Sequence, residues 1–392
     1  MAPFTETIPT LAQIPSPPLQ DLTARLPAEV VLEVFLFVAA FKPSEHKQTP
    51  PSTRVSHVCR RWREIALQHQ ILWTTLSMPH FDGISMNLER SGTLPLTVHL
   101  IHVFPSKIPR RTYDHLALEA LPRVRSLAFS LWPRYDYSTL WTRPAPRLES
   151  LTLTALRRRV GLSLVDFKRL TDDIFDAHVP RLRTLRLHAC EIHPTSPLFS
   201  AQLRKLELKN IRCLFPTAPN LHDPEALLDA LRTMPNLEEL AIISPVSEKG
   251  WLERVVDEGP VVPLDRLCKL VLEDYASRLS SFIRRLRRPA TCSVALRMIN
   301  MHDEDLTAVS QSVDEALAPL RAAKFVYNKV HVSWEGVDPG YWYTNGGIEV
   351  VRIVVSEPED PSLPAHLEMT IDVEEMDISP TLVALTHIFP PS

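Results

Sequence analysis

Two short stretches of the sequence bring together side chains that bind metal ions in proteins. One is "HACEIH" at residues 188–193, and the other is His57 with Cys59. His57 and Cys59 lie two residues apart on an expected helix, about 200° apart around its axis, so they point to opposite sides. In "HACEIH", Cys190 falls at a buried turn position of the strand pattern described below, whereas His188 points outward. We therefore expect no metal ion and no other cofactor.

The sequence has two arginine-rich runs. The first, "RRWR" at residues 60–63, would suit nuclear import or phosphate binding, but a solvated helix face is the simpler interpretation. The second, "IRRLRRP" at residues 283–289, would suit a nucleic-acid site. In the second run Phe282, Ile283 and Leu286 predict an ordinary amphipathic helix with the arginines on its solvated face. The formal net charge of −3, from 43 basic and 46 acidic residues, gives no general attraction to nucleic acid or to anionic membranes. We expect neither as a partner.

The residue patterns of common enzymes are missing from the sequence. Only 9 of the 392 residues are glycine, and neither G-x-G-x-x-G nor G-x-x-x-x-G-K-[ST] occurs, which disfavours nucleotide chemistry. There is no H-E-x-x-H, no recognisable nucleophile motif and no carboxylate pair spaced for acid–base work. We therefore expect a protein that is not an enzyme.

The cysteines and the N-terminus bear on where the protein resides. The five cysteines are odd in number, widely separated and free of any C-x-x-C, which favours a reducing compartment. Residues 1–21 are proline-rich and lack the basic and apolar regions of a secretion signal, so they predict a disordered leader. The most apolar run, residues 30–41, is shorter than the roughly 20 residues that span a bilayer. We expect a soluble protein that is cytoplasmic, nuclear or both.

Residues 22–80 carry the pattern of a small helical module. From Leu26 the sequence "LPAEVVLEVFLFVAAF" has proline in its first turn and apolar residues at helical spacing, which predicts an amphipathic helix ending near Phe41. The proline-rich residues 42–54 predict a loop. A second helix is expected over residues 55–66. Two short helices this apolar cannot bury both faces against each other, so a partner or the rest of the chain must cover the remainder.

Within this module Leu26-Pro27 and Glu29 are followed by "VSHVCRRWREIA" at residues 55–66 and then by Leu72-Trp73. In this order the residues resemble an F-box, although the loop over residues 42–54 is long for one. The resemblance implies that the helices dock on a Skp-type adaptor and, through it, join a cullin-RING ubiquitin ligase. The adaptor-binding residues that it implies are Leu26, Pro27, Val30, Val58, Cys59 and Trp62.

A second pattern recurs over residues 81–300. Copies of P-[RN]-[VL]-x-x-L-x-[LFI] begin at Pro122, Pro146, Pro180 and Pro235, and copies without the proline begin at Leu203 and Leu267. The shared L-x-x-L-x-L resembles the strand of a leucine-rich repeat, in which the last two apolar residues point into the core. In the copy "LRTLRLHACEI", Cys190 takes the buried turn position.

A unit of helix, proline and short strand has one apolar face that only a neighbouring copy can bury. One such helix is predicted in "DPEALLDALRTMP", with Asp223 as its N-cap, Pro224 in its first turn and Pro235 as its stop. The expected fold is therefore α/β: a short all-helical F-box followed by an irregular leucine-rich-repeat solenoid with a parallel sheet and outer helices. This arrangement resembles F-box proteins with divergent leucine-rich repeats, including the type abundant in fungi.

The outward residues of successive strands are expected to form three rows. They are Ser126, Ser150, Thr184, Lys205, Glu239, Lys269; then Ala128, Thr152, Arg186, Glu207, Ala241, Val271; then Ser130, Thr154, His188, Lys209, Ile243, Glu273. Because solenoids commonly bind partners on this surface, Arg186, His188, Lys205, Glu207 and Lys209 are candidates for target recognition. In the other interpretation, opposite charges stabilise adjacent strands by roughly 0.2–1 kcal/mol each. The sequence leaves both interpretations open.

Residues 301–392 are expected to close the solenoid. Alternating apolar residues in "KFVYNKVHVSW" and "IEVVRIVV" predict terminal strands. The aromatic residues expected to cover the core are Trp334, Tyr341, Trp342 and Tyr343. The acidic segments "EPEDP" and "DVEEMD" predict solvated surface.

The predicted function is that of a substrate-receptor subunit of an SCF-type cullin-RING ubiquitin ligase. Its F-box docks on a Skp-type adaptor, and its repeats bind an unknown target protein. The alternative is an interaction scaffold outside any ligase, whose helical module caps the solenoid. The two differ at Leu26, Val58 and Trp62, which are buried within the chain in the scaffold and left for another protein in the receptor.

Overall fold

The computed structural model divides the chain into two compact units, Met1–Trp73 and Thr74–Ser392, and each unit is described by itself. The residues that the structure describes are 22–40, 51–77, 82–100, 120–131, 141–155, 168–209, 212–213, 224–243, 259–274, 276–301, 311–312, 314–316, 318–319, 329–337, 348–356 and 367–374. The leader expected over residues 1–21 lies outside the described residues.

The described part of the first unit is helical. Its elements are η1 (Leu22–Arg25), α1 (Ala28–Ala40), α2 (Pro51–Ser56), α3 (Arg60–Gln68) and η2 (Gln70–Trp73). Pro27 directly precedes α1, and Pro51 is the first residue of α2. Proline suits these places because the first turn of a helix leaves its N–H groups unbonded in any case.

The three α-helices of the first unit pack around a small core. In α1 the fully buried side chains are Val31 and Phe35, which are 1% and 0% exposed. The buried residues of the other helices are Val55, Ile65, Ala66, Leu72 and Trp73. The Trp73 indole Nε1 donates a hydrogen bond to the Ala66 carbonyl at 2.9 Å, so the largest side chain of this core also has its polar atom bonded.

The single helix expected over residues 55–66 is wrong, because two helices share this stretch. α2 ends at Ser56 and α3 begins at Arg60, and α2 also takes in residues 51–54, which were expected to be loop. Cys59 is the N-cap of α3: its backbone is extended and its Sγ accepts a hydrogen bond from the Trp62 N–H at 3.5 Å. Periodicity alone did not indicate this cap, since cysteine is not among the residue types usually found there.

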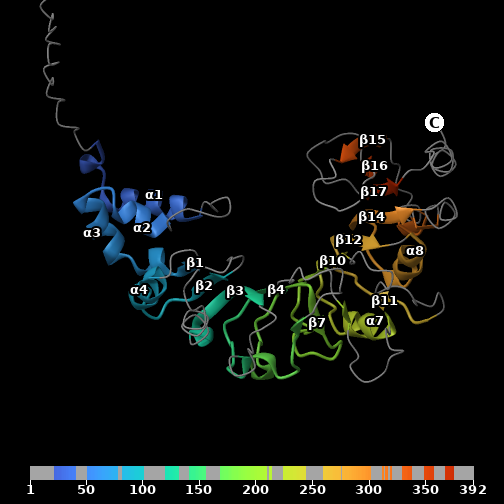
Figure 1. The fold of residues 1–392 in the computed structure, drawn as a ribbon, viewed down its shortest axis with the longest axis horizontal. Helices are drawn as coiled ribbons and strands as arrows, with labels where there is room; N and C mark the ends of the chain where they lie inside the picture. The colour runs from blue at the N-terminus through green and yellow to red at the C-terminus, as the bar shows by residue number, and fades with distance from the viewer. Residues whose placement is uncertain are drawn as a thin grey trace, which may run out of the picture. The chain divides into compact units, whose positions relative to one another are not determined.

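The second unit is built on one large sheet. Within the described residues it has twelve strands, in the order β1 (Thr75–Ser77), β2 (Leu96–Leu100), β3 (Val124–Leu131), β4 (Ser150–Ala155), β6 (Thr184–His188), β8 (Lys205–Lys209), β10 (Glu239–Ile243), β12 (Lys269–Asp274), β14 (Ser293–Met301), β17 (Leu367–Glu374), β16 (Ile348–Ser356) and β15 (Lys329–Val337). All pairs from β1 to β17 are parallel, whereas β17, β16 and β15 pair antiparallel. Figure 1 shows the strands following one another in chain order up to β14.

Smaller elements join the strands of this sheet. The helices are α4 (Asp82–Arg90), α7 (Pro224–Arg232), α8 (Ala276–Arg284), η3 (Leu121–Arg123) and η4 (Ile174–Ala177). Two short parallel ladders run beside the main sheet: β5 (Lys168–Arg169), β7 (Cys190–Ile192) and β9 (Arg212–Cys213) form one, and β11 (Val262–Pro263) and β13 (Leu286–Arg287) form the other. Parallel strands need such crossovers, because a tight turn can only reverse the chain.

The six strands predicted from the repeated pattern are confirmed as β3, β4, β6, β8, β10 and β12. Their two inward positions are buried throughout, for example Leu185 and Leu187 in β6 and Leu206 and Leu208 in β8. The helix predicted at residue 224 is confirmed as α7, whose buried residues are Leu227, Leu228, Ala230 and Leu231. Its expected N-cap, Asp223, lies outside the described residues.

Four strands of the sheet were not predicted from the repeated pattern. β1, β2 and β14 continue the parallel series without a full copy of L-x-x-L-x-L, and β17 joins β14 to the C-terminal strands. β15 and β16 confirm the two strands expected near the C-terminus. The segment "DVEEMD", expected to be solvated surface, begins inside β17 at Asp372. Trp334 lies in β15, and the segment with Tyr341, Trp342 and Tyr343 lies outside the described residues.

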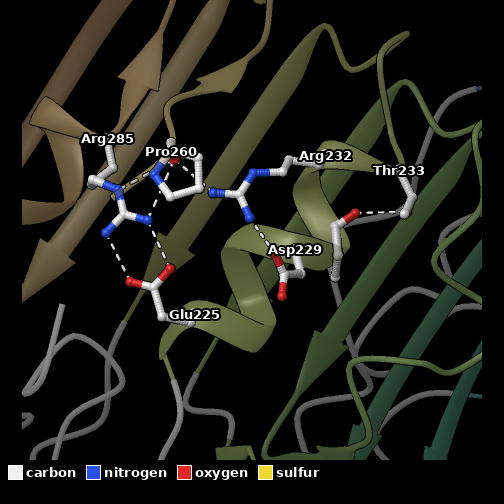
Figure 2. Close-up of polar contacts among 7 residues, drawn as sticks. Glu225, Asp229, Arg232, Thr233, Pro260 and Arg285 are labelled. Atoms are coloured by element: carbon white, nitrogen blue, oxygen red, sulfur yellow. Dashed lines mark hydrogen bonds and ion pairs between the residues drawn. The ribbon is translucent and has the colours of Figure 1, made fainter. Parts of the chain in front are cut away.

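The helix expected over residues 283–289 with solvated arginines is also wrong. α8 ends at Arg284 and the chain turns at once into β13, so Arg285 and Arg288 point inward, whereas Arg287 stays exposed. Arg285 is 1% exposed and Arg288 is 6% exposed. Figure 2 shows the Arg285 guanidinium facing the carboxylate of Glu225 on α7, with the carbonyl of Pro260 beside it. These arginines hold neighbouring segments of the chain together.

Among the described residues, no helix combines the length and the apolar character that a bilayer crossing requires.

Candidate functional site

Exposed apolar side chains are concentrated in the first unit. Among the described residues, the large hydrophobic side chains classed as exposed are Leu26, Val30, Val34, Phe37, Val58, Leu67 and Ile71 in this unit, and Val261 in the second. Their exposed fractions run from 39% for Leu26 to 67% for Phe37. Scattered apolar residues are normal on a protein surface, and here most of the exposed ones lie on one small helical unit.

Leu26, Val30 and Val34 together form the apolar stripe. Val30 and Val34 lie one helical turn apart on α1, and Leu26 lies four residues before Val30 at the entrance to the helix. The buried Val31 and Phe35 each come one residue later, about 100° further round the axis. α1 therefore has two apolar faces, and the small core of the unit buries only one of them.

The six residues expected to bind an adaptor fall into two groups. Leu26, Pro27, Val30 and Val58 are exposed, and Val58 is 61% exposed at the turn between α2 and α3. Cys59 and Trp62 are half-buried and engaged inside the unit. Leu26 and Val58 thus have exposed side chains, whereas Trp62 packs within the first unit.

Trp62 packs against α1 and reaches η1. Its ring centroid lies 4.9 Å from that of Phe35, and its Nε1 donates a hydrogen bond to the Thr23 Oγ1 at 2.8 Å. The neighbouring Arg61 donates from its two terminal nitrogens to the carbonyls of Thr23 and Leu26. No sequence pattern indicated this role for Arg61, because a basic run predicts a solvated face until its partners are known.

One face of the main sheet carries the three rows expected from the repeat frame, although two of the residues expected to face outward, Ala128 and Ser130 in β3, are buried at 6% and 4% exposure. The parallel register places Ser126, Ser150, Thr184, Lys205, Glu239 and Lys269 opposite one another in turn, and the other two rows follow in the same register. In β6, β8 and β10 these outward side chains alternate with buried ones. The register is confirmed because a slip of one residue would turn the buried leucines outward.

Three of the five candidate target-binding residues form one charged cluster. Glu207 Oε2 lies 3.1 Å from Arg186 Nε, and Glu207 Oε1 lies 3.0 Å from His188 Nε2. The hydrogen bond to His188 lowers the pKa of the Glu207 carboxyl, and the charges of His188 and Arg186 act in the same direction, while burial opposes them. The Glu207 carboxylate therefore has both of its oxygens occupied by groups on β6.

The other charges of this face also pair across strands. Lys205 Nζ lies 2.5 Å from Glu239 Oε1, and Arg297 Nη1 lies 3.7 Å from Glu273 Oε2. Within the part of the chain that the structure describes, Lys209 and Lys269 make no ion pair within 4.0 Å. Opposite charges thus pair on neighbouring strands, as one of the two interpretations expected, and the role of this face in target recognition stays a prediction.

The candidate metal ligands of "HACEIH" are used in other ways. His188 bonds to Glu207, and the buried Cys190 has its Sγ 3.2 Å from the His188 carbonyl and 3.7 Å from the Leu153 carbonyl. No group of three or more histidine, cysteine or acidic side chains in the described ranges is arranged to hold a metal ion.

Comparison with known proteins identifies one region. Residues 23–79 match the F-box-like family, and this stretch is therefore an F-box-like domain. F-box domains generally bind Skp-type adaptors, which suggests a substrate-receptor role of the SCF kind in general terms. No curated protein and no solved structure matches the chain.

Proposed function

We propose that this protein is a substrate-receptor subunit of an SCF-type cullin-RING ubiquitin ligase. Its F-box-like domain docks on a Skp-type adaptor, and the adaptor links it to a cullin. Its second unit, a divergent leucine-rich-repeat solenoid, binds a target protein. The receptor performs no bond chemistry: it holds a target lysine near the ubiquitin thioester of a conjugating enzyme, and this proximity raises the effective concentration of the reacting groups.

The single observation that carries this proposal is the apolar stripe. Leu26, Val30 and Val34 are each about two-fifths exposed, although they belong to a unit with a well-filled core. An amphipathic helix with apolar side chains four residues apart is the usual form of a helix that lies in a hydrophobic groove of a partner. Burying the exposed two-fifths of one such valine contributes up to about 1 kcal/mol to binding.

The target is proposed to bind the exposed face of the sheet near Arg186, His188, Lys205, Glu207 and Lys209. Carboxylates on this face are paired with cations of neighbouring strands, whereas Lys209 and Lys269 have no acidic partner among the described residues. The face therefore offers more positive than negative charge, which favours a target with acidic groups.

Co-purification of the full chain with a Skp-type adaptor tests the ligase role. Val30→Glu and Val58→Glu place a charge at exposed positions, so they leave the fold intact while opposing burial in a partner. We expect stoichiometric capture by the wild type and at least about tenfold weaker binding by either variant.

Val261→Glu is the matched control, because Val261 is 50% exposed in the second unit. It changes the same side chain in the same way and should capture the adaptor like the wild type. Absence of capture by the wild type would remove the ligase role. Equal capture by all three variants would show that the exposed valines of the F-box-like domain do not form the docking surface.

The alternative, an interaction scaffold outside any ligase, makes a different prediction for the same experiment. In a scaffold the helical module caps the chain, so Leu26 and Val58 would be covered by the protein itself. A scaffold would therefore capture no Skp-type adaptor.

A further inference from the structure

We infer that Arg61 is a positioning residue for adaptor docking: its guanidinium holds the segment from Thr23 to Leu26 against α3 and so fixes the place of Leu26 just before α1. This inference rests on the proposed function, since it concerns the surface that the adaptor would cover. It assigns a role to a side chain that does not itself belong to the apolar stripe.

The first step of the argument is the bonding of the segment. The two terminal nitrogens of Arg61 donate to the carbonyls of Thr23 and Leu26, which lie 38 and 35 residues earlier in the chain. Thr23 O also accepts from the Leu26 N–H at 3.0 Å, which closes η1. The planar guanidinium can reach two carbonyls at once, and a lysine ammonium has no equivalent fork.

The second step is that α3 is itself held in place. The Trp62 indole donates to Thr23 Oγ1 at 2.8 Å and packs on Phe35, and the Cys59 Sγ caps the first turn of α3. Arg61 thus projects from a helix start that is tied to α1 by its neighbour. A rigid base of this kind gives a side chain the ability to order a short segment elsewhere in the chain.

The third step concerns the segment that is ordered. η1 is only four residues long, and the residues that follow Thr23 and Ala24, namely Arg25, Leu26 and Pro27, are exposed. Without the Arg61 bonds, Leu26 would sample several positions. Ordering it on docking would then cost conformational entropy, and this cost would weaken adaptor binding. With them, Leu26 is presented at a fixed place beside the start of α1.

The test measures adaptor affinity and hydrogen exchange in the full-length protein for Arg61→Ala and Arg61→Lys. Arg60→Ala is the matched control, because the Arg60 side chain is 93% exposed and pairs only with Glu64 within the described residues. For Arg61→Ala we expect faster exchange at residues 22–27 and about tenfold weaker adaptor binding. Arg61→Lys should fall between the alanine variant and the wild type, and Arg60→Ala should match the wild type.

A second control separates positioning from simple loss of stability. Ile65→Val trims the buried core of the same unit without touching the Arg61 bonds, so it lowers the melting temperature while leaving exchange at residues 22–27 and adaptor affinity unchanged. Equal losses of affinity in Ile65→Val and Arg61→Ala at equal melting temperatures would overturn the inference.

The inference and the proposed function fail in different ways. Wild-type protein that captures no adaptor would remove the proposed function, and with it the docking role of Arg61. Wild-type protein that captures the adaptor, together with an Arg61→Ala variant of unchanged affinity or unchanged exchange, would overturn the inference alone.

Discussion

Glu225 and Arg285 form a two-pronged ion pair across 60 residues of chain. Both terminal nitrogens of Arg285 lie 2.7 Å from the oxygens of the Glu225 carboxylate. The hydrogen bonds from Arg285 are the main cause that lowers the pKa of Glu225, and the same contact raises the pKa of Arg285. Arg285 also donates from Nε to the Pro260 carbonyl at 3.3 Å, so the pair ties α7 to the segments before β11 and after α8 (Figure 2).

Glu225→Ala should destabilise the second unit by about 3 kcal/mol, because it leaves a buried guanidinium without its carboxylate. The value lies at the low end for a buried pair, since the Glu225 side chain is 34% exposed. Urea unfolding followed by tryptophan fluorescence measures it. Asp229→Ala is the control on the same helix: it removes the partner of Arg232 at an exposed site and should cost at most about 1 kcal/mol. Similar losses of unfolding free energy in both variants would show that the burial of Arg285 does not increase the contribution of its ion pair to stability.

Gly259→Ala should also destabilise the protein, although the added group is a single methyl. A Cβ at this position would lie 2.5 Å from the Cζ of Arg285, and the guanidinium cannot move aside without leaving Glu225. We expect a cost of about 1–3 kcal/mol. In an Arg285→Met background the obstacle is gone, so the same glycine substitution should cost much less. An unchanged cost in the double variant would locate the strain elsewhere.

Glu207→Gln should change how stability depends on acid. The folded pKa of Glu207 lies below its ordinary value of 4.5, so the charged carboxylate stabilises the fold at any pH above about 4.5. This contribution, about 1 kcal/mol for a partly exposed carboxylate, is lost as the pH falls through the folded pKa.

Wild type and Glu207→Gln should therefore differ in unfolding free energy at pH 7 and converge below pH 4.5. Lys209→Gln on the same strand is the control. Because it leaves the Glu207 carboxylate in place, its unfolding free energy should depend on pH in the same way as that of the wild type. A wild-type curve parallel to that of Glu207→Gln would contradict the assignment.

The cysteines should differ sharply in reactivity toward a thiol reagent. Burial raises the pKa of the Cys292 thiol to about 11, and Cys190 is also buried, whereas Cys268 is exposed. At pH 8 only about one Cys292 thiol in a thousand is ionised, and the reagent must also reach it. Peptide mapping after brief labelling should find Cys268 modified, with Cys190 and Cys292 modified only after unfolding. Cys268→Ser removes the fast reaction at that position, and fast labelling of Cys292 in that variant would contradict its burial.

The strands show what a local pattern can determine. In L-x-x-L-x-L the alternation of apolar and polar residues settles which side chains face the core, and one buried face fixes the register of every neighbour. The rows through Arg186 and Glu207 therefore follow from the spacing of the leucines alone. β1, β2 and β14 were missed because their neighbours, rather than a complete pattern, define them.

Contacts between distant parts of the chain determine the features that no local pattern predicts. The sequence by itself determined the F-box-like order of residues in the first unit and the repeated strands of the second, because both depend on spacing within a few turns or residues. Only the tertiary structure decided the roles of the arginines: Arg60 faces water, Arg61 holds Leu26, and Arg285 is buried against Glu225. Each guanidinium carries the same charge, and its role depends on which carbonyl or carboxylate the fold brings from a distant part of the chain.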